Sequence, residues 1–70
     1  LDDVVSCIRL GGFVNADPEF PFVPKVVNGA SDLMAEIFGP VIGTHARTAI
    51  GVATLPQNAA VEVDAIFAVR

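Results

Sequence analysis

Arg47 lies near the start of an apolar stretch, ARTAIGVATL, and is one of only four basic residues in the chain. If this stretch is a strand, alternation places three small residues on the face of the Arg47 side chain: Ala49, Gly51 and Ala53. A guanidinium beside a small-residue face has room for a small acid, and its planar fork matches a carboxylate through two parallel hydrogen bonds. The alternative is a strand-end arginine that pairs with a surface acid, and spacing alone leaves both interpretations open.

Two carboxylates, Glu62 and Asp64, interrupt the last apolar stretch, AVEVDAIFAVR. Alternation puts both on one face, opposite a set that has the character of a core face: Val61, Val63, Ala65, Phe67 and Val69. Acids in such positions are usually solvent-side residues. On the functional interpretation, one carboxylate holds or activates a water molecule.

Other kinds of site find little support in the composition. His45 is the only histidine and Cys7 the only cysteine, so the sequence predicts neither a metal site nor a cofactor. The formal net charge is −4 and the basic residues are scattered, which argues against nucleic-acid binding. No apolar run is long enough to span a membrane. A lone cysteine cannot form an internal disulfide, which suits a reducing compartment, and we expect a cytoplasmic protein.

The order of elements that would position these residues is strand, helix, strand, strand. We expect strands over residues 3–16, 46–55 and 60–70, and a helix over residues 25–39 whose apolar residues recur at three- and four-residue spacings. Pro24 suits the first turn of that helix, and the Gly39–Pro40 pair closes its far end. This pattern predicts an α+β fold with the helix packed on one face of a mixed sheet.

The segment PQNA, at residues 56–59, is interpreted as a tight hairpin between the last two strands. Such a hairpin would pair Arg47 near Ala68 and Glu62 near Ala53, about 20 Å apart at the rise of a strand. The two side chains could then meet only across a subunit boundary. Gly11 and Gly12 suggest a bulge or a close backbone approach in the first strand, and Gly29 suggests close packing of the helix on the sheet.

The chain is short for its hydrophobicity. It has 70 residues, 53% of them hydrophobic, and a sheet of three strands with one helix is about half of a typical α+β domain. A domain of this size buries too little surface to be robust alone, so we expect part of the apolar surface to face another chain.

The ending ARTAIGVATLPQNAAVEVDAIFAVR resembles the signature of the YjgF-like, reactive-intermediate deaminase (RidA) family, also called endoribonuclease L-PSP. Upstream, LDDVVSCIRLGGFV resembles the strand that follows the family's first helix, and KVVNGASDLMAEIFG resembles its second helix. The residues of these segments are most similar to those of a longer branch of the family. The resemblance implies that residues 1–70 are the C-terminal half of one chorismate mutase-like domain, without its first three strands and helix. It also implies a homotrimer with sites in the clefts between subunits, and a companion N-terminal half.

Residue by residue, the same resemblance implies a set of roles. Arg47 would grip a substrate carboxylate, the backbone of Ala49 would contact the substrate, and Glu62 would position the water that attacks an imine carbon. Asn28 stands where the family often has an asparagine at the start of the helix. His45 replaces a residue that is usually proline, and the resemblance gives it no role.

Three functions follow as hypotheses. The first is hydrolysis of small 2-imino or enamino acids to 2-keto acids and ammonia, where positioning of a water is the main task. The second is non-catalytic binding or sensing of a small carboxylate metabolite in a trimer, through the same arginine. The third is an endoribonuclease, which the acidic charge balance and the absence of a histidine pair argue against.

Overall fold

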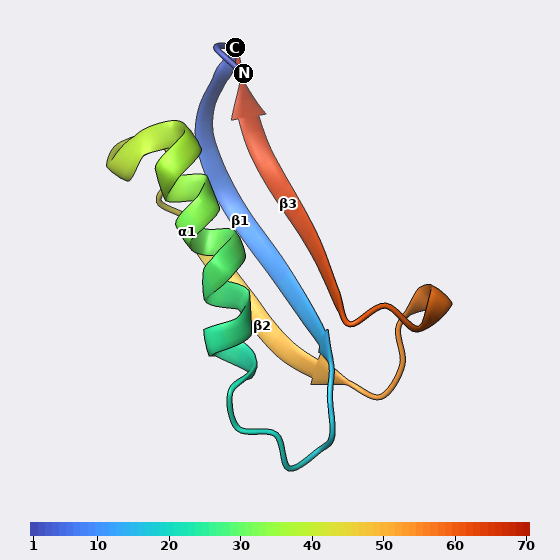
Figure 1. Ribbon diagram of the computed structural model, residues 1–70. Helices are drawn as coiled ribbons and strands as arrows, with labels where there is room; N and C mark the ends of the chain where they lie inside the picture. The colour runs from blue at the N-terminus through green and yellow to red at the C-terminus, as the bar shows by residue number, and fades with distance from the viewer.

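The computed structural model describes all 70 residues and confirms the α+β class: one helix packs across one face of a three-stranded mixed sheet (Figure 1). The elements follow in the order β1 (Val4–Asn15), α1 (Val23–Ile42), β2 (Ala46–Val52), a short 3₁₀ turn (Pro56–Asn58) and β3 (Val61–Val69). No helix is both long enough and apolar enough to cross a bilayer.

The strand order is β2-β1-β3, so the predicted hairpin between the last two strands is wrong. The first strand lies in the centre, parallel to β2 and antiparallel to β3. Leu10 of β1 is level with Arg47 on one side and with Ala65 on the other. Arg47 therefore does not pair near Ala68.

The connection from β2 to β3 explains the difference, because it passes over the end of β1 and Asn15 holds it there. The backbone N–H of Asn15 donates to Ala60 O at 2.9 Å. Its side-chain amide donates to Ala59 O at 3.2 Å and to Asn58 Oδ1 at 3.3 Å. Gln57 and Asn58 both adopt left-handed backbone conformations, with φ of 56°. PQNA is thus part of a longer loop that steps over one strand.

The helix is longer than predicted at both ends. It begins at Val23, with Pro24 in its first turn as expected, because a proline there gives up an N–H that has no helical partner. Gly39 breaks the helical geometry with φ of 84°, and a further turn continues through Pro40 to Ile42. The predicted stop at Gly39–Pro40 is therefore a kink rather than the end.

The small core lies between α1 and the central strand. Its buried hydrophobic residues come from β1 and from the start of α1: Cys7, Leu10, Val14, Val23 and Val27. Of the two interpretations of Gly11 and Gly12, a close approach is the one found at Gly12, because a Cβ there would lie 2.5 Å from Val27 Cγ2. The corresponding prediction for Gly29 is wrong: it is exposed, with no atom within 4 Å of where its Cβ would stand.

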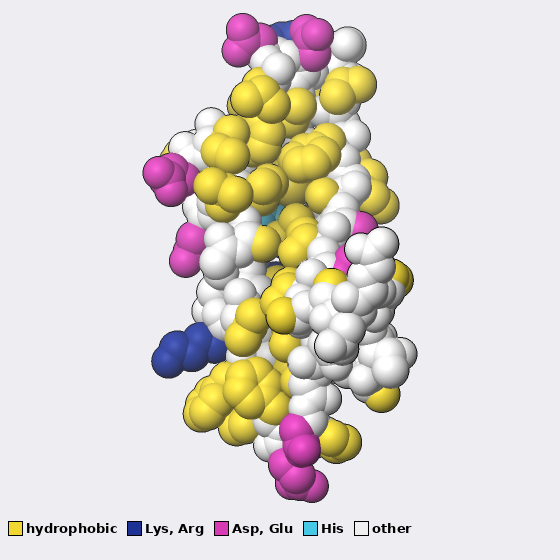
Figure 2. Space-filling model, turned by 45° about the vertical axis from the view of Figure 1, so that its right-hand side comes forward, with side chains coloured by type: hydrophobic (Ala, Val, Ile, Leu, Met, Phe, Trp, Pro, Cys, Tyr) yellow, Lys and Arg dark blue, Asp and Glu magenta, His cyan; other side chains and the backbone are white.

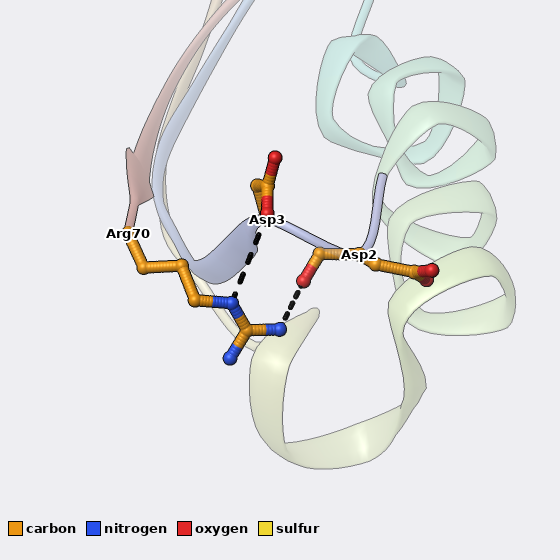
Figure 3. Close-up of polar contacts among 3 residues, drawn as sticks. All are labelled: Asp2, Asp3 and Arg70. Carbon is orange, nitrogen blue, oxygen red and sulfur yellow. Dashed lines mark hydrogen bonds and ion pairs between the residues drawn. The ribbon is translucent and has the colours of Figure 1, made fainter.

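The two ends of the chain lie side by side (Figure 1), because β1 starts where the antiparallel β3 finishes. Arg70 joins them (Figure 3): its Nε lies 3.9 Å from Asp3 Oδ1, and Nη2 donates to the carbonyl oxygen of Asp2. Its backbone N–H also donates to Asp3 O at 3.0 Å. The ion pair is exposed, so it adds little stability by itself.

Much of the apolar surface is left uncovered. Figure 2 shows hydrophobic side chains gathered in a band along most of the long axis of the molecule. The helix packs on β1 and β2 and reaches β3 through Phe38, whose ring centroid is 5.6 Å from that of Phe67. Val61 and Val63 lie on the predicted core face of β3, yet they are 41% and 44% exposed because nothing covers them.

Candidate functional site

Arg47 lies on the face of β2 that α1 covers, and its guanidinium is held by two acceptors from the helix. Nη1 donates to Ser31 Oγ at 3.1 Å, and Nη2 donates to the carbonyl oxygen of Pro24 at 3.2 Å. Neither of the two ion pairs in the structure involves Arg47. A guanidinium has five N–H donors, so three remain for a ligand, and the side chain is only partly buried.

Ser31 and His45 continue this hydrogen-bonded cluster. His45 Nε2 lies 3.0 Å from Ser31 Oγ, and Nδ1 lies 2.6 Å from the carbonyl oxygen of Gly43. A carbonyl oxygen can only accept, so Nδ1 carries a proton. In the neutral ring Nε2 is then the acceptor, and the Ser31 hydroxyl donates to it. The cluster of Ser31, His45 and Arg47 gathers a hydroxyl, an imidazole and a cation at the start of β2.

The small-residue face beside Arg47 is confirmed, but the space above it is filled. Ala49 packs against the cluster formed by Val14, Val23 and Val27. Gly51 lies below Val23, whose Cγ2 is 3.5 Å from where a glycine Cβ would stand. The expectation that small side chains leave room for an acid is therefore wrong at Ala49, directly beside Arg47, because α1 occupies that room, whereas Gly51 and Ala53 line an open pocket farther along the strand. A ligand can reach only the outer N–H groups of Arg47.

Glu62 lies on the opposite face of the sheet from Arg47. It pairs with Phe13, whereas Arg47 is level with Leu10, and strand alternation puts Phe13 and the buried Leu10 on opposite faces. Along the strands the two side chains are only three residues apart, about 10 Å, rather than the predicted 20 Å. Two strand spacings and the sheet itself nevertheless separate them, so one copy of the chain cannot bring both to one small ligand.

Asp64 and Asn28, the other polar residues singled out by the sequence, are also placed away from Arg47. Asp64 Oδ1 lies 3.6 Å from Arg9 Nη1, an exposed ion pair on the same face as Glu62. Asn28 is exposed on the second turn of α1 and makes no side-chain hydrogen bond. No group of three or more His, Cys, Asp and Glu side chains is arranged to hold a metal ion.

A shallow pocket lies at the other end of β2, and it does not reach Arg47. Its lining combines the loop after β1, the start of α1 and the end of β2: Ala16, Asp17, Pro18, Phe20, Val23, Gly51, Val52 and Ala53. Asp17 is its only charged residue, so the pocket has no cation for a carboxylate. The chemically versatile side chains gather at the start of β2 instead.

Sequence reasoning missed Ser31 altogether and gave His45 no role. Both belong to elements whose contact is set by the crossover from α1 to β2, and neither sits in a motif. The only available signal was position: His45 stands two residues before Arg47, on the same face if the strand begins early.

These features together define an α+β half-domain with the YjgF-like fold. The whole chain superposes on part of the Agrobacterium tumefaciens protein Atu1372, of unknown function, with a TM-score of 0.96 and 47% identity. In addition, 90% of the chain superposes on a candidate endoribonuclease from Shewanella oneidensis, with a TM-score of 0.84 and 35% identity. It is also 53% identical over 66 residues to Protein TCP17 from Trypanosoma cruzi.

The similarity covers nearly all of this chain but less than half of each of these proteins. The chain spans 41% of the length of Protein TCP17, 43% of the Agrobacterium protein and 41% of the Shewanella protein. No protein-family model matches the sequence. The comparisons therefore establish the fold of the region.

Proposed function

We propose that the protein hydrolyses small 2-imino acids to 2-keto acids and ammonia, with Arg47 as the carboxylate-binding residue. The observation that carries the proposal is the state of the Arg47 guanidinium: two acceptors on α1 fix its orientation, and three N–H donors are left. An arginine held in this way presents its fork without first having to be ordered, which favours bidentate binding of a carboxylate.

In this proposal the site is completed by a second copy of the chain. Glu62 would position the attacking water, but it lies on the other face of the sheet from Arg47 of the same chain. A homotrimer, with Glu62 of one copy near Arg47 of the next, would bring the two together. The backbone of Ala49, on the edge strand β2, and the exposed side chain of Asn28, on α1, are further proposed substrate contacts. A reducing, cytoplasmic compartment would suit the single buried cysteine, Cys7.

The test is ligand binding by arginine variants. Arg47→Ala should abolish calorimetric binding of small 2-keto acids, such as 2-oxobutanoate, the product of 2-iminobutanoate. Arg47→Lys should restore it poorly, because an ammonium lacks the fork, and one that donates to both Ser31 and Pro24 has a single N–H left for a carboxylate. Arg9→Ala is the matched control, since it removes a guanidinium from the other face of the sheet. Unchanged affinity in Arg47→Ala would refute the proposal.

Binding without turnover would instead support a sensor of small carboxylates. That outcome is measured directly, by following keto acid formation from 2-iminobutanoate generated in situ. A protein that binds 2-oxobutanoate through Arg47 but does not accelerate this hydrolysis is a binding module.

Ribonuclease activity is a second candidate, favoured by the Shewanella protein, which is described as a candidate endoribonuclease. Arg47 could hold a phosphate as well as a carboxylate. Against this, the net charge is −4 and Lys25 and three arginines are the only basic side chains, so a polyanion would find little to attract it. Cleavage of RNA by purified protein, lost in Arg47→Ala, would favour this candidate over the first.

A further inference from the structure

We propose that Ser31 and His45 form a proton relay beside Arg47, in which the Ser31 hydroxyl exchanges protons with a bound 2-imino acid and His45 stores the proton. The relay rests on the proposed function, because it needs a substrate held at Arg47. It assigns chemistry to one residue of α1 and to one residue directly before β2.

The hydrogen bonds of the cluster allow the relay to exist in two states. With a neutral ring, the Ser31 hydroxyl donates its proton to His45 Nε2, 3.0 Å away. With a protonated ring, Nε2–H donates to Ser31 Oγ, and the serine proton turns outward. The carbonyl oxygen of Gly43 accepts from Nδ1 in both states, at 2.6 Å, and therefore fixes the ring without competing for the moving proton.

The position of Arg47 connects this relay to a ligand. Its Nη1 donates to Ser31 Oγ at 3.1 Å, so the serine oxygen lies directly beside the guanidinium. The imine carbon of a 2-imino acid is bonded to its carboxylate carbon. In the proposed orientation, a substrate whose carboxylate lies on the free N–H groups of Arg47 places its imine group on the side of Ser31.

The proposed hydrolysis requires one proton to pass from the attacking water to the Ser31–His45 pair and then to return to the substrate nitrogen. The substrate enters as the protonated imine, C=NH2⁺. As water oxygen bonds to its carbon, the π electrons move to nitrogen and give a carbinolamine. The released water proton passes to Ser31 Oγ while the serine proton passes to His45 Nε2. The imidazolium then returns this proton, through Ser31, to the amino nitrogen. The C–N bond breaks, the hydroxyl oxygen becomes the carbonyl, and its proton leaves with ammonia as ammonium.

Glu62 could not perform this transfer from the same chain, since it faces the other side of the sheet. On the face of the sheet that carries Arg47, Ser31 is the only side chain that hydrogen bonds to Arg47. His45 is the only other group that hydrogen bonds to the Ser31 side chain. Orientation of water by Glu62 of a neighbouring copy and proton transfer by Ser31 and His45 are then separate tasks.

The competing explanation is that the cluster only fastens β2 to α1. The experiment separates the two by measuring kcat, KM and 2-oxobutanoate affinity for His45→Gln and Ser31→Ala, with 2-iminobutanoate generated in situ. Glutamine can keep a hydrogen bond to Ser31 but cannot carry the proton. A relay predicts a kcat lower by ~10² to 10⁴ in both variants. Affinity should be nearly unchanged in His45→Gln, whereas Ser31→Ala also removes one of the two acceptors that orient Arg47 and should weaken binding. Asp32→Asn, exposed and adjacent to Ser31, is the matched control and should keep full turnover.

A third variant protects the test against misfolding. His45→Ala should lose turnover and regain part of it when free imidazole is added, which a purely structural role would not produce. A kcat within about twofold of the unmutated protein in both His45→Gln and Ser31→Ala would overturn the relay and leave carboxylate binding by Arg47 intact. Retained 2-oxobutanoate binding in Arg47→Ala would instead overturn the proposed function, and the relay with it.

Discussion

At the scale of single residues, the decisive fact about Glu62 is which face of β3 it occupies. Its partner Phe13 and the Asp64–Arg9 ion pair fix it on the face that α1 does not cover. On that face the Glu62 carboxylate either is exposed to solvent or contacts a neighbouring copy of the chain. A single isosteric substitution distinguishes these two environments.

Glu62→Gln should keep the fold and the affinity for 2-keto acids, because glutamine has the same shape and can still hydrogen bond. If Glu62 positions the attacking water, turnover should fall by ~10² to 10⁴. If it is only a solvated strand residue, stability should change by less than about 0.5 kcal/mol and turnover should not change. The measurement is turnover per assembled oligomer.

Normalising to the oligomer matters because Glu62 could also hold copies together. In that case the variant would weaken assembly, and activity would fall only in proportion to the oligomer lost. Turnover per oligomer equal to that of the unmutated protein would remove Glu62 from the mechanism. Asp64→Asn, on the same strand and face, is the control for a general effect of removing one carboxylate.

At the scale of elements, two glycines provide a matched test of how α1 sits on the sheet. Gly12→Ala should destabilise the protein by about 1–3 kcal/mol, because its Cβ would lie 2.5 Å from Val27 Cγ2 in a packed contact. Gly29→Ala should stabilise it by about 0.4–1 kcal/mol, because the site is open and alanine favours helix. Urea unfolding at fixed protein concentration measures both.

A second substitution identifies the cause of the Gly12 effect. In Val27→Ala the colliding methyl groups are absent, so adding Gly12→Ala to that background should cost much less than it does in the unmutated protein. Equal costs in the two backgrounds would mean that α1 does not pack on the central strand through the contact between Val27 and Gly12.

The elements themselves could be predicted well from local pattern, and their arrangement could not. β-Favouring residues without helical spacing predicted β1 to within a residue at either end, and the apolar stretch at the end of the chain did the same for β3. Alternation then assigned Arg47 and Glu62 to definite faces of their strands. Strand order depends on pairings between residues far apart in the sequence, so PQNA looked like a hairpin. The same limit hid Ser31, whose hydrogen bonds to His45 and Arg47 join two separate elements.

At the scale of the whole molecule, the amount of uncovered apolar surface predicts association. Eight of the 70 residues are buried, too few for a self-sufficient core. Large hydrophobic side chains are exposed along α1 and on both faces of the sheet, among them Leu33, Ile37, Ile50, Val63 and Ile66. Sedimentation velocity should therefore find an assembly of several copies, and we expect three.

The control is a variant with less apolar surface, Val63→Thr, which keeps strand propensity and should shift the distribution towards smaller species. A folded monomer of 7.3 kDa, with native circular dichroism and no concentration dependence, would contradict the prediction.

The central position of the first strand also governs the order in which the protein can fold. Val4 pairs with Val69, so the sheet closes only when the last residues of β3 arrive. The β1–α1–β2 crossover involves shorter separations along the chain and should form earlier, since closing a longer loop costs more entropy. During that interval the β3-facing edge of the central strand is unpaired, and an unpaired edge invites pairing with other chains. The step most exposed to aggregation is thus the docking of β3, and conditions that slow this step should lower the yield of refolded protein.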